Sequence, residues 1–186
     1  SVDGKPHPLP KPFLVLATQN PVEHEGTYVL PESQLDRFAL RVEVGYPPED
    51  DELRIMRRRD PGKAIASLAP ALTAHEMVGL QDRVGDVIVD ASVARYMLAL
   101  VQATRAHDQV QLGVSPRGAL LFFEACQARA LVEGREYVTP ADVKTMSTPV
   151  LAHRLLVRSR SADLAGLARE RERIVHEILE SVKVPL

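Results

Sequence analysis

The stretch Phe13–Val44, FLVLATQNPVEHEGTYVLPESQLDRFALRVEV, decides how this chain is organised. It contains two runs typical of β-strands with a polar segment between them. The first run, Phe13–Ala17, is short and uniformly apolar, which is typical of a strand buried on both faces of a parallel sheet. The second run, Ala39–Val44, alternates apolar and polar residues and predicts a strand with one face in water. The sequence after these runs predicts helices.

The first run ends abruptly in the polar segment Thr18-Gln19-Asn20-Pro21. Ligands of open α/β sheets bind beyond the carboxyl ends of the strands, so a polar segment that a proline fixes there is a candidate site. An asparagine before a proline also commonly hydrogen-bonds only its own turn. On spacing alone, both interpretations of Asn20 stay open.

Length and composition narrow the class of protein. A chain of 186 residues can hold one domain, or part of a domain plus a small helical bundle. Its single cysteine, Cys126, excludes a disulfide framework and fits a reducing compartment. The net charge of -2 gives no global attraction to nucleic acid or anionic membrane. There is no apolar run near the roughly 20 residues of a membrane span and no signal-peptide pattern, so we expect a cytoplasmic protein without a membrane span.

Start signals mark several helices after the second run. They are a capping box at Thr73–Glu76, a cap at Asp90, and N-caps followed by proline at Ser115-Pro116 and Thr139-Pro140. The helix that begins after Ser115 is apolar nearly all round and ends at Gly134, so we expect it at the centre of a bundle. A last amphipathic segment, Leu164–Val182, is expected to pack on the bundle or on a neighbouring subunit.

Two separated segments resemble MoxR-type AAA+ ATPases: ATQNPVEHEGTYVLPESQLDRFAL (Ala17–Leu40) and GVSPRGALLFFEACQARALVEGREYVTPADVK (Gly113–Lys144). The first is similar to the part that holds sensor 1 and the arginine finger, and the second to the lid with sensor 2. In order and spacing the resemblance runs from about Val2 to Leu156.

The resemblance implies a fold of class α/β plus all-α, mostly helical overall. Residues 1–47 would be the C-terminal portion of a P-loop AAA+ core, and residues 48–186 a helical linker and an all-α lid. Tyr46-Pro47-Pro48 ends the second predicted strand and marks this boundary. Ser1–Pro12 would be the trailing half of the β-hairpin that precedes sensor 1.

The resemblance also assigns roles to two residues of the first segment. Asn20 would be sensor 1, whose amide holds the attacking water and a phosphate oxygen. Arg37 would be the arginine finger that one subunit offers to the nucleotide of its neighbour, a group worth about 10³–10⁵ in rate. The alternative for Arg37 is a surface salt bridge, worth less than about 1 kcal/mol. Ser33 and Ala39 depart mildly from the family pattern and leave Arg37 in place.

Arg117 lies in the first turn of the helix that begins after Ser115. The helix dipole already presents positive charge there, so a cation is unfavourable unless an anion is bound. This position predicts a phosphate ligand, and the resemblance makes Arg117 sensor 2. The alternative is an arginine that extends from an apolar helix to water. By the same resemblance, Tyr46 would contact the adenine of the nucleotide.

The motifs that bind a nucleotide most directly do not occur in these 186 residues. There is no G-x-x-x-x-G-K-[ST], because Gly62-Lys63 is followed by Ala64. Val87–Asp90 imitates a Walker B strand, yet Ala91 stands where the catalytic glutamate would be. We therefore expect the C-terminal part of an ATPase that uses ATP and Mg²⁺. Alone, this part should neither bind ATP tightly nor hydrolyse it, and its unpaired strands should make it self-associate.

The function that the resemblance implies is chaperone-like remodelling or activation of partner proteins, driven by ATP hydrolysis. Family members assemble as rings, with a hexamer expected here, and often work with von Willebrand A domain proteins. We expect no nucleic-acid partner. An alternative from another class is a non-enzymatic helical interaction module, in which Arg57-Arg58-Arg59 and the last helix bind protein or nucleic acid.

Overall fold

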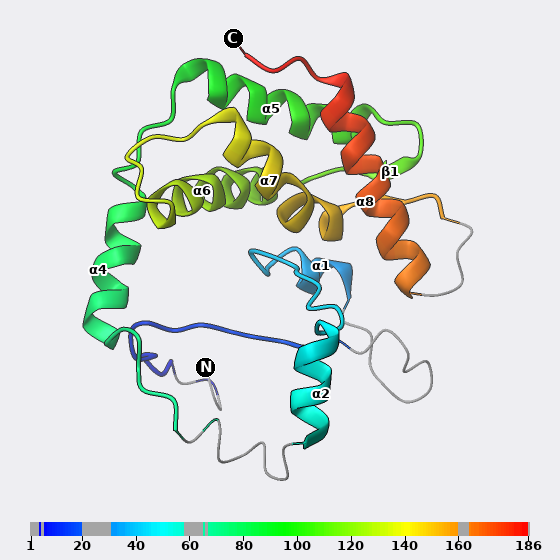
Figure 1. The fold of residues 1–186 in the computed structure, drawn as a ribbon. Helices are drawn as coiled ribbons and strands as arrows, with labels where there is room; N and C mark the ends of the chain where they lie inside the picture. Colours follow the sequence, from blue (N-terminus) through cyan, green and yellow to red (C-terminus); the bar gives the residue numbers. More distant parts are fainter. Residues whose placement is uncertain are drawn as a thin grey trace. The chain divides into compact units, whose positions relative to one another are not determined.

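A computed structural model describes residues 4, 6–19, 31–57, 65, 67–159 and 164–185, drawn as a coloured ribbon in Figure 1. The chain divides into two compact units, of which unit 1 comprises residues 1–13 and 42–79, and unit 2 comprises residues 14–41 and 80–186. Every buried residue among those described belongs to unit 2. Unit 2 therefore provides the hydrophobic core.

Unit 1 contains helix α2, Glu49–Arg57, and the beginning of helix α4, Ala74–Val84. The first turn of α2 is acidic and its last turn carries two arginines, which complements the helix dipole. The capping box at the start of α4 is confirmed. Glu76 Oε2 accepts from the Thr73 backbone N–H at 2.7 Å, and Thr73 Oγ1 accepts from the Glu76 N–H at 3.2 Å.

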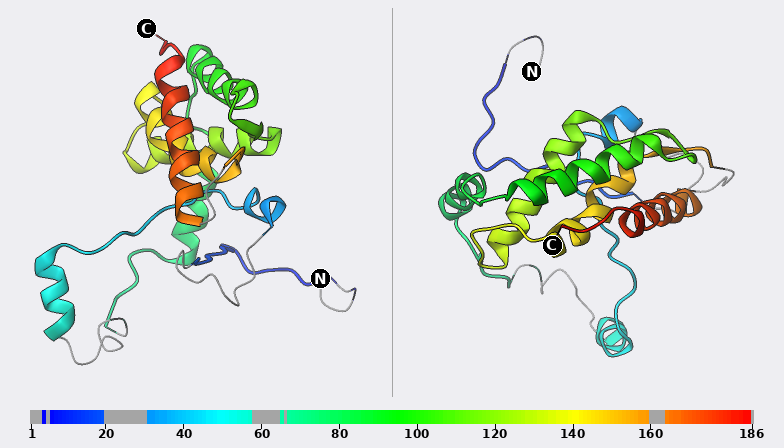
Figure 2. Two further views of the ribbon diagram at one scale, coloured as in Figure 1. Left: turned by 90° about the vertical axis from the view of Figure 1, so that its right-hand side faces the viewer. Right: turned by 90° about the horizontal axis from the view of Figure 1, so that it is seen from above.

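Unit 2 is built mainly from helices. In chain order they are α1 (Glu32–Leu35), the end of α4, α5 (Ala91–Ala106), α6 (Pro116–Val132), α7 (Pro140–Leu151), the 3₁₀ helix η1 (Ala152–Arg154) and α8 (Leu164–Ser181). Helix α6 contacts both α5 and α7, and α8 contacts α5, α7 and η1. Figure 2 shows α5, α6, α7 and α8 gathered in one body.

The predicted caps are confirmed at the start of α5, α6 and α7. Asp90 Oδ1 accepts from the Ser92 N–H at 2.7 Å. Ser115 caps α6 with Pro116 in the first helical position, and Thr139 forms a capping box at α7. Each cap satisfies backbone N–H groups that have no partner within the helix. The sequence therefore determines where each of these helices begins.

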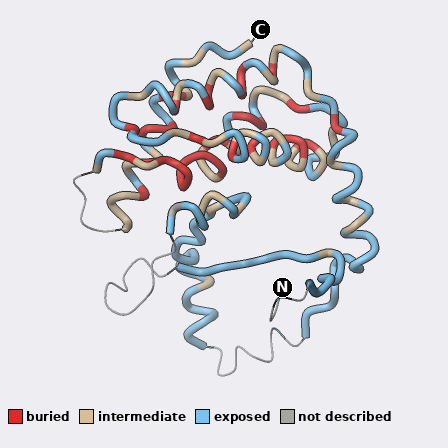
Figure 3. Tube along the Cα trace, turned by 180° about the vertical axis from the view of Figure 1, so that it is seen from behind, coloured by how far each residue is buried: buried red, intermediate tan, exposed pale blue. Residues whose placement is uncertain are grey.

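The core lies where α5, α6, α7 and α8 meet, and Figure 3 shows the buried residues concentrated there. Helix α5 buries a stripe of apolar residues spaced three and four apart: Val93, Tyr96, Met97, Leu100 and Val101. Phe122 and Cys126 of α6 are fully buried, and burial raises the pKa of the Cys126 thiol to about 12. Leu120 of α6 is 59% exposed, so the apolar surface that the sequence gives this helix is buried only in part.

A short antiparallel ladder pairs the connection between α5 and α6 with the segment after η1. Strand β1, Val110–Leu112, pairs with strand β2, Leu156–Val157, and Val110 lies opposite Val157. The sequence analysis did not anticipate these strands, because runs of two or three residues carry no readable alternation. Their pairing fixes the segment after η1 next to the loop that leads into α6.

Asp142 closes the connection between α6 and α7. Its side chain is 3% exposed and accepts from both terminal nitrogens of Arg135, at 2.6 and 2.7 Å, and from the backbone N–H of Thr139 at 2.8 Å. Burial raises the pKa of Asp142, but the hydrogen bonds from Arg135 and Thr139 outweigh it and lower the pKa to about 2. Asp142 therefore stays ionised and holds this corner together.

The two predicted strands at Phe13–Ala17 and Ala39–Val44 do not form. Both segments are described as extended chain without ladder partners among the described residues, and Leu16 and Val44 are 86% and 96% exposed. A strand is stabilised by its neighbours, and here no described segment pairs with either run. The prediction that Phe13–Ala17 is buried on both faces is therefore wrong for this chain. None of the described helices is long and apolar enough to cross a membrane.

Candidate functional site: an arginine-rich contact between α1, α6 and η1

The candidate site begins at the turn that follows α1. The backbone N–H of Arg37 donates to Gln34 O, and that of Phe38 donates to Leu35 O, both at 3.1 Å. This turn continues the one-turn helix and leaves Arg37 exposed. Because α1 contacts η1 within unit 2, the turn is held against the helical bundle.

Arg154 of η1 binds backbone carbonyl groups of this turn. Its guanidinium donates to the carbonyl oxygens of Phe38 at 2.5 Å and of Asp36 and Ala39 at 3.3 Å each. It also donates to Val150 O, and its Nε lies 3.3 Å from Asp36 Oδ1. The Arg154 side chain is 1% exposed, so its charge is compensated inside the protein by one carboxylate and a set of carbonyls.

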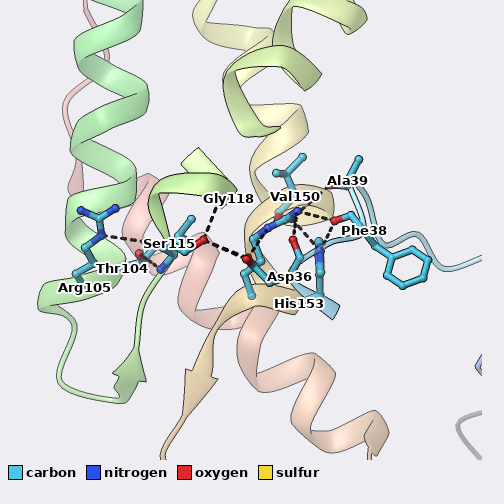
Figure 4. Close-up of polar contacts among 11 residues, drawn as sticks. Asp36, Phe38, Ala39, Thr104, Arg105, Ser115, Gly118, Val150 and His153 are labelled. Carbon is cyan, nitrogen blue, oxygen red and sulfur yellow. Dashed lines mark hydrogen bonds and ion pairs between the residues drawn. The ribbon is translucent and has the colours of Figure 1, made fainter. Parts of the chain in front are cut away.

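Ser115 connects the same turn to α6. Its hydroxyl donates to the Asp36 carboxylate, at 3.2 Å from Oδ2, and accepts from the Gly118 N–H at 3.0 Å. Figure 4 shows Asp36 between Ser115 on one side and Phe38 and His153 on the other. Asp36, which directly precedes Arg37, is therefore hydrogen-bonded to the N-terminus of the helix that carries Arg117.

Arg117 is the second residue of α6 and is exposed. In the described part of the chain, no carboxylate forms an ion pair with Arg117 or Arg37. The positive charge of Arg117 is close enough to Arg154 to contribute to a lowered Arg154 pKa, after the larger effect of burial. Arg154 and the capping residue of α6 thus contact a single carboxylate, Asp36, and Arg37 and Arg117 add two exposed positive charges on the segments that carry these contacts. This arrangement favours an anion.

His153 lies under the turn and is 4% exposed. Its Nε2 is 3.2 Å from Phe38 O and 2.8 Å from a terminal nitrogen of Arg154. Burial, followed by the charge of Arg154, lowers the pKa of His153 to about 4. The ring is therefore neutral at physiological pH.

Acid should destabilise the chain through His153. Below about pH 6.5, His153 binds a proton in the unfolded state, whereas in the folded state it stays neutral down to about pH 4. The free energy of unfolding therefore falls between these two pH values. We expect the free energy of unfolding to drop by about 2–3 kcal/mol across this window. Urea titrations at pH 7 and pH 4.5 measure it. His153→Gln should make the free energy of unfolding less dependent on pH. The control His75→Gln, at an exposed position, should leave this pH dependence unchanged. A parent chain that is equally stable at pH 7 and pH 4.5 would contradict the lowered pKa of His153.

The structure brings together some of the residues that the sequence singled out. Arg37 and Arg117 belong to the same unit and are joined through Asp36 and Ser115. Tyr46 is 96% exposed and belongs to unit 1. Asn20 lies outside the described residues, as do Arg58 and Arg59 of the arginine triplet.

Sequence reasoning missed Asp36, His153 and Arg154 as parts of the site. The one available signal was the run Val150–Val157, in which His153 and Arg154 interrupt otherwise apolar residues. Polar groups within such a run are buried only when they are paired. Their partners are more than 100 residues away in the chain, and no local pattern identifies them.

Comparison with known families and proteins supports an ATPase relationship. Residues 102–178 match the model described as AAA lid domain, and residues 1–40 match the model described as ATPase family associated with various cellular activities (AAA). The chain is 42% identical to the uncharacterized protein YeaC of Bacillus subtilis over its full length, which covers 57% of that protein. It is 36% identical to the chaperone MoxR1 of Mycobacterium tuberculosis, again over its full length and 50% of that protein.

Two further matches are more distant. The chain is 31% identical to the magnesium-chelatase 38 kDa subunit of Cereibacter sphaeroides, over 91% of this chain and 49% of that protein. A crystal structure of a candidate ATPase from Cytophaga hutchinsonii matches with a TM-score of 0.84 and 30% identity, over all of this chain and 58% of that one. The chain thus spans about half the length of the curated relatives it matches.

Proposed function

The chain belongs to the MoxR family of AAA+ ATPases, and on that premise we propose that the full-length protein hydrolyses ATP with Arg37 and Arg117 on the transferring phosphate. Phosphoryl transfer needs a positioned water and positive charge where negative charge builds on the terminal phosphate. Two exposed arginines without carboxylate partners among the described residues can supply that charge. Asn20, if it is sensor 1, would hold the water.

One observation carries this proposal. Asp36 accepts from Ser115 at 3.2 Å, and these residues directly precede Arg37 and the first turn of α6. The two arginine-bearing segments are therefore linked within one unit. We infer that a nucleotide contacted by Arg37 is also contacted by Arg117 of the same unit.

We further propose that both arginines act on the nucleotide of a neighbouring subunit in a ring, with a hexamer expected. The arginine finger acts across the subunit boundary, and Arg117 shares its unit. By the family resemblance, Tyr46 would contact the adenine of a nucleotide. In this arrangement hydrolysis at each site requires two subunits, so the rate should fall with dilution of the assembly.

ATP and Mg²⁺ are the proposed ligands of the full-length protein. The exposed Arg117 at the N-terminus of α6 and the exposed Arg37 after α1 fit a triphosphate, whose charge they would neutralise. Among the described residues no group of three or more His, Cys, Asp or Glu side chains could hold a metal ion. The sequence lacks G-x-x-x-x-G-K-[ST] and spans about half the length of its curated relatives, so we propose that the phosphate-binding loop and the magnesium ligands belong to other parts of the full-length protein and expect the 186-residue chain alone to be inactive.

The proposed role of hydrolysis is remodelling or activation of partner proteins. It is supported by the name of the chaperone MoxR1, to which the chain is 36% identical. Proteins with von Willebrand A domains are the partners we would test first. Pull-down with the full-length protein, in the presence and absence of ATP, measures whether such partners bind in a nucleotide-dependent way.

Replacing Arg117 tests the proposal for α6. Arg117→Ala in the full-length protein should lower kcat for ATP hydrolysis by about 10²-fold, because one preorganised donor to developing charge is lost. Phosphate release at saturating Mg²⁺ and ATP measures it. Arg95→Ala, which removes an exposed arginine near the start of α5, is the matched control and should keep full activity. If Arg117→Ala stays within about threefold of the parent, Arg117 does not act on the phosphate.

A further inference from the structure

We propose that Arg154 is a positioning residue that directs Arg37 toward the nucleotide by fixing the backbone on both sides of it. The inference rests on the proposed function, in which Arg37 acts on the transferring phosphate. Arg154 itself is not catalytic, because its side chain is 1% exposed and cannot reach a ligand. Its effect on the reaction would pass through Arg37.

The contacts of Arg154 bracket Arg37 in the chain. Its guanidinium donates to the carbonyl of the residue before Arg37, at 3.3 Å, and to that of the residue after it, at 2.5 Å. A guanidinium presents five donors in a rigid plane, so it can hold several acceptors at fixed relative positions. The peptide units on either side of Arg37 are therefore held by one rigid group.

Arg154 is in turn held on its other side. It donates to Val150 O on α7, and its Nε lies 3.3 Å from the Asp36 carboxylate. Gly118 of α6 makes the space for it, since a Cβ there would lie 2.8 Å from Arg154 Cδ. The absence of a side chain at position 118 thus lets the arginine stem pass under the first turn of α6.

The same cluster ties the turn to the helix of Arg117. Asp36 pairs with Arg154 and accepts from Ser115, which caps α6. One buried cation and one carboxylate therefore set the positions of both arginines that we assign to the phosphate. Burying a charge is costly, so a buried arginine that binds mainly backbone carbonyls of a single turn is explained by the need to hold that turn.

The test uses the full-length protein and four variants. Arg154→Ala should lower kcat for ATP hydrolysis by about 10²-fold with KM for ATP little changed, because a displacement of about 1 Å of a catalytic group costs this much. Arg37→Ala should lower kcat further. The double variant should match Arg37→Ala alone, since Arg154 acts only through Arg37. Arg158→Ala, which removes an exposed arginine four residues on, should keep full activity.

A second measurement follows the turn itself in the 186-residue chain. The amides of Arg37, Phe38 and Arg41 donate to backbone carbonyls, that of Arg41 to Pro149 O at 2.9 Å. Their hydrogen exchange should accelerate at least about tenfold in Arg154→Ala, while amides in the middle of α6 stay protected. If Arg154→Ala fails to fold, Asp36→Asn and Gly118→Ala disturb the same cluster with less loss of packing and should accelerate the same amides.

The outcomes separate the two proposals. The role of Arg154 is overturned, and the proposed function kept, if Arg37→Ala loses activity while Arg154→Ala keeps full activity. Full activity in both Asp36→Asn and Gly118→Ala would overturn the role of Arg154 in the same way. Multiplying losses in the double variant also overturn it, because they show independent action. Full activity of Arg37→Ala overturns the proposed function of the finger itself, and with it the inference.

Discussion

Replacing Arg37 with alanine in the full-length protein should lower kcat for ATP hydrolysis by about 10³-fold or more, with nucleotide binding retained. The guanidinium is exposed, has no ion-pair partner among the described residues, and belongs to a residue within a turn that is fixed by buried contacts. It can therefore place positive charge on the transferring phosphate, an effect worth about 4 kcal/mol or more. Single-turnover phosphate release measures the hydrolysis step, and a separate measurement of nucleotide affinity measures the binding step.

Arg37→Lys is the informative companion variant. Lysine keeps the charge but lacks the planar fork that binds two oxygens at once, so it should restore only part of the rate. Mixing Arg37→Ala subunits with parent subunits should lower activity in proportion to the sites that receive the altered neighbour. A kcat within about threefold of the parent for Arg37→Ala would show that Arg37 is a surface residue only.

Phe122→Ala should destabilise the 186-residue chain by about 3–5 kcal/mol. Phe122 is fully buried in the middle of α6, where that helix meets the rest of the core, and its removal leaves a cavity that neighbouring helices cannot fill. Chemical unfolding followed by circular dichroism measures the loss. This is a large fraction of the stability of a typical domain, so the variant should be partly unfolded at physiological temperature.

Leu120→Ala is the matched control, because it lies two residues earlier on the same helix and is 59% exposed. The change should cost less than about 0.5 kcal/mol. Equal losses for the two variants would mean that α6 does not occupy the centre of the core. The comparison tests the bundle independently of any nucleotide chemistry.

The sequence was sufficient for the helices because their signals are local. Asp90, Ser115 and Thr139 act on backbone groups two or three residues away, and each begins a helix where predicted. The buried stripe of α5 follows from a spacing of three and four residues. Such features need no knowledge of the rest of the fold.

The candidate site was predictable only in part, for the opposite reason. Arg37 and Arg117 were proposed from motifs and, for Arg117, from its unfavourable place at a helix start. Arg154 and Asp36 were not found, because their pairing joins segments 118 residues apart and depends on how η1 packs against α1. Phe13–Ala17 was wrongly predicted to be a strand buried on both faces, and Ala39–Val44 a strand with one face in water, because an apolar pattern does not say which chain segments would pair with a strand or cover it.

The most direct test is a structure of the assembled full-length protein with Mg²⁺ and a non-hydrolysable ATP analogue. We predict that guanidinium nitrogens of Arg37 and Arg117 from one subunit lie within about 3.5 Å of phosphate oxygens of the same nucleotide, bound by the neighbouring subunit. Arginines that point to different nucleotides, or away from every phosphate, would contradict the account.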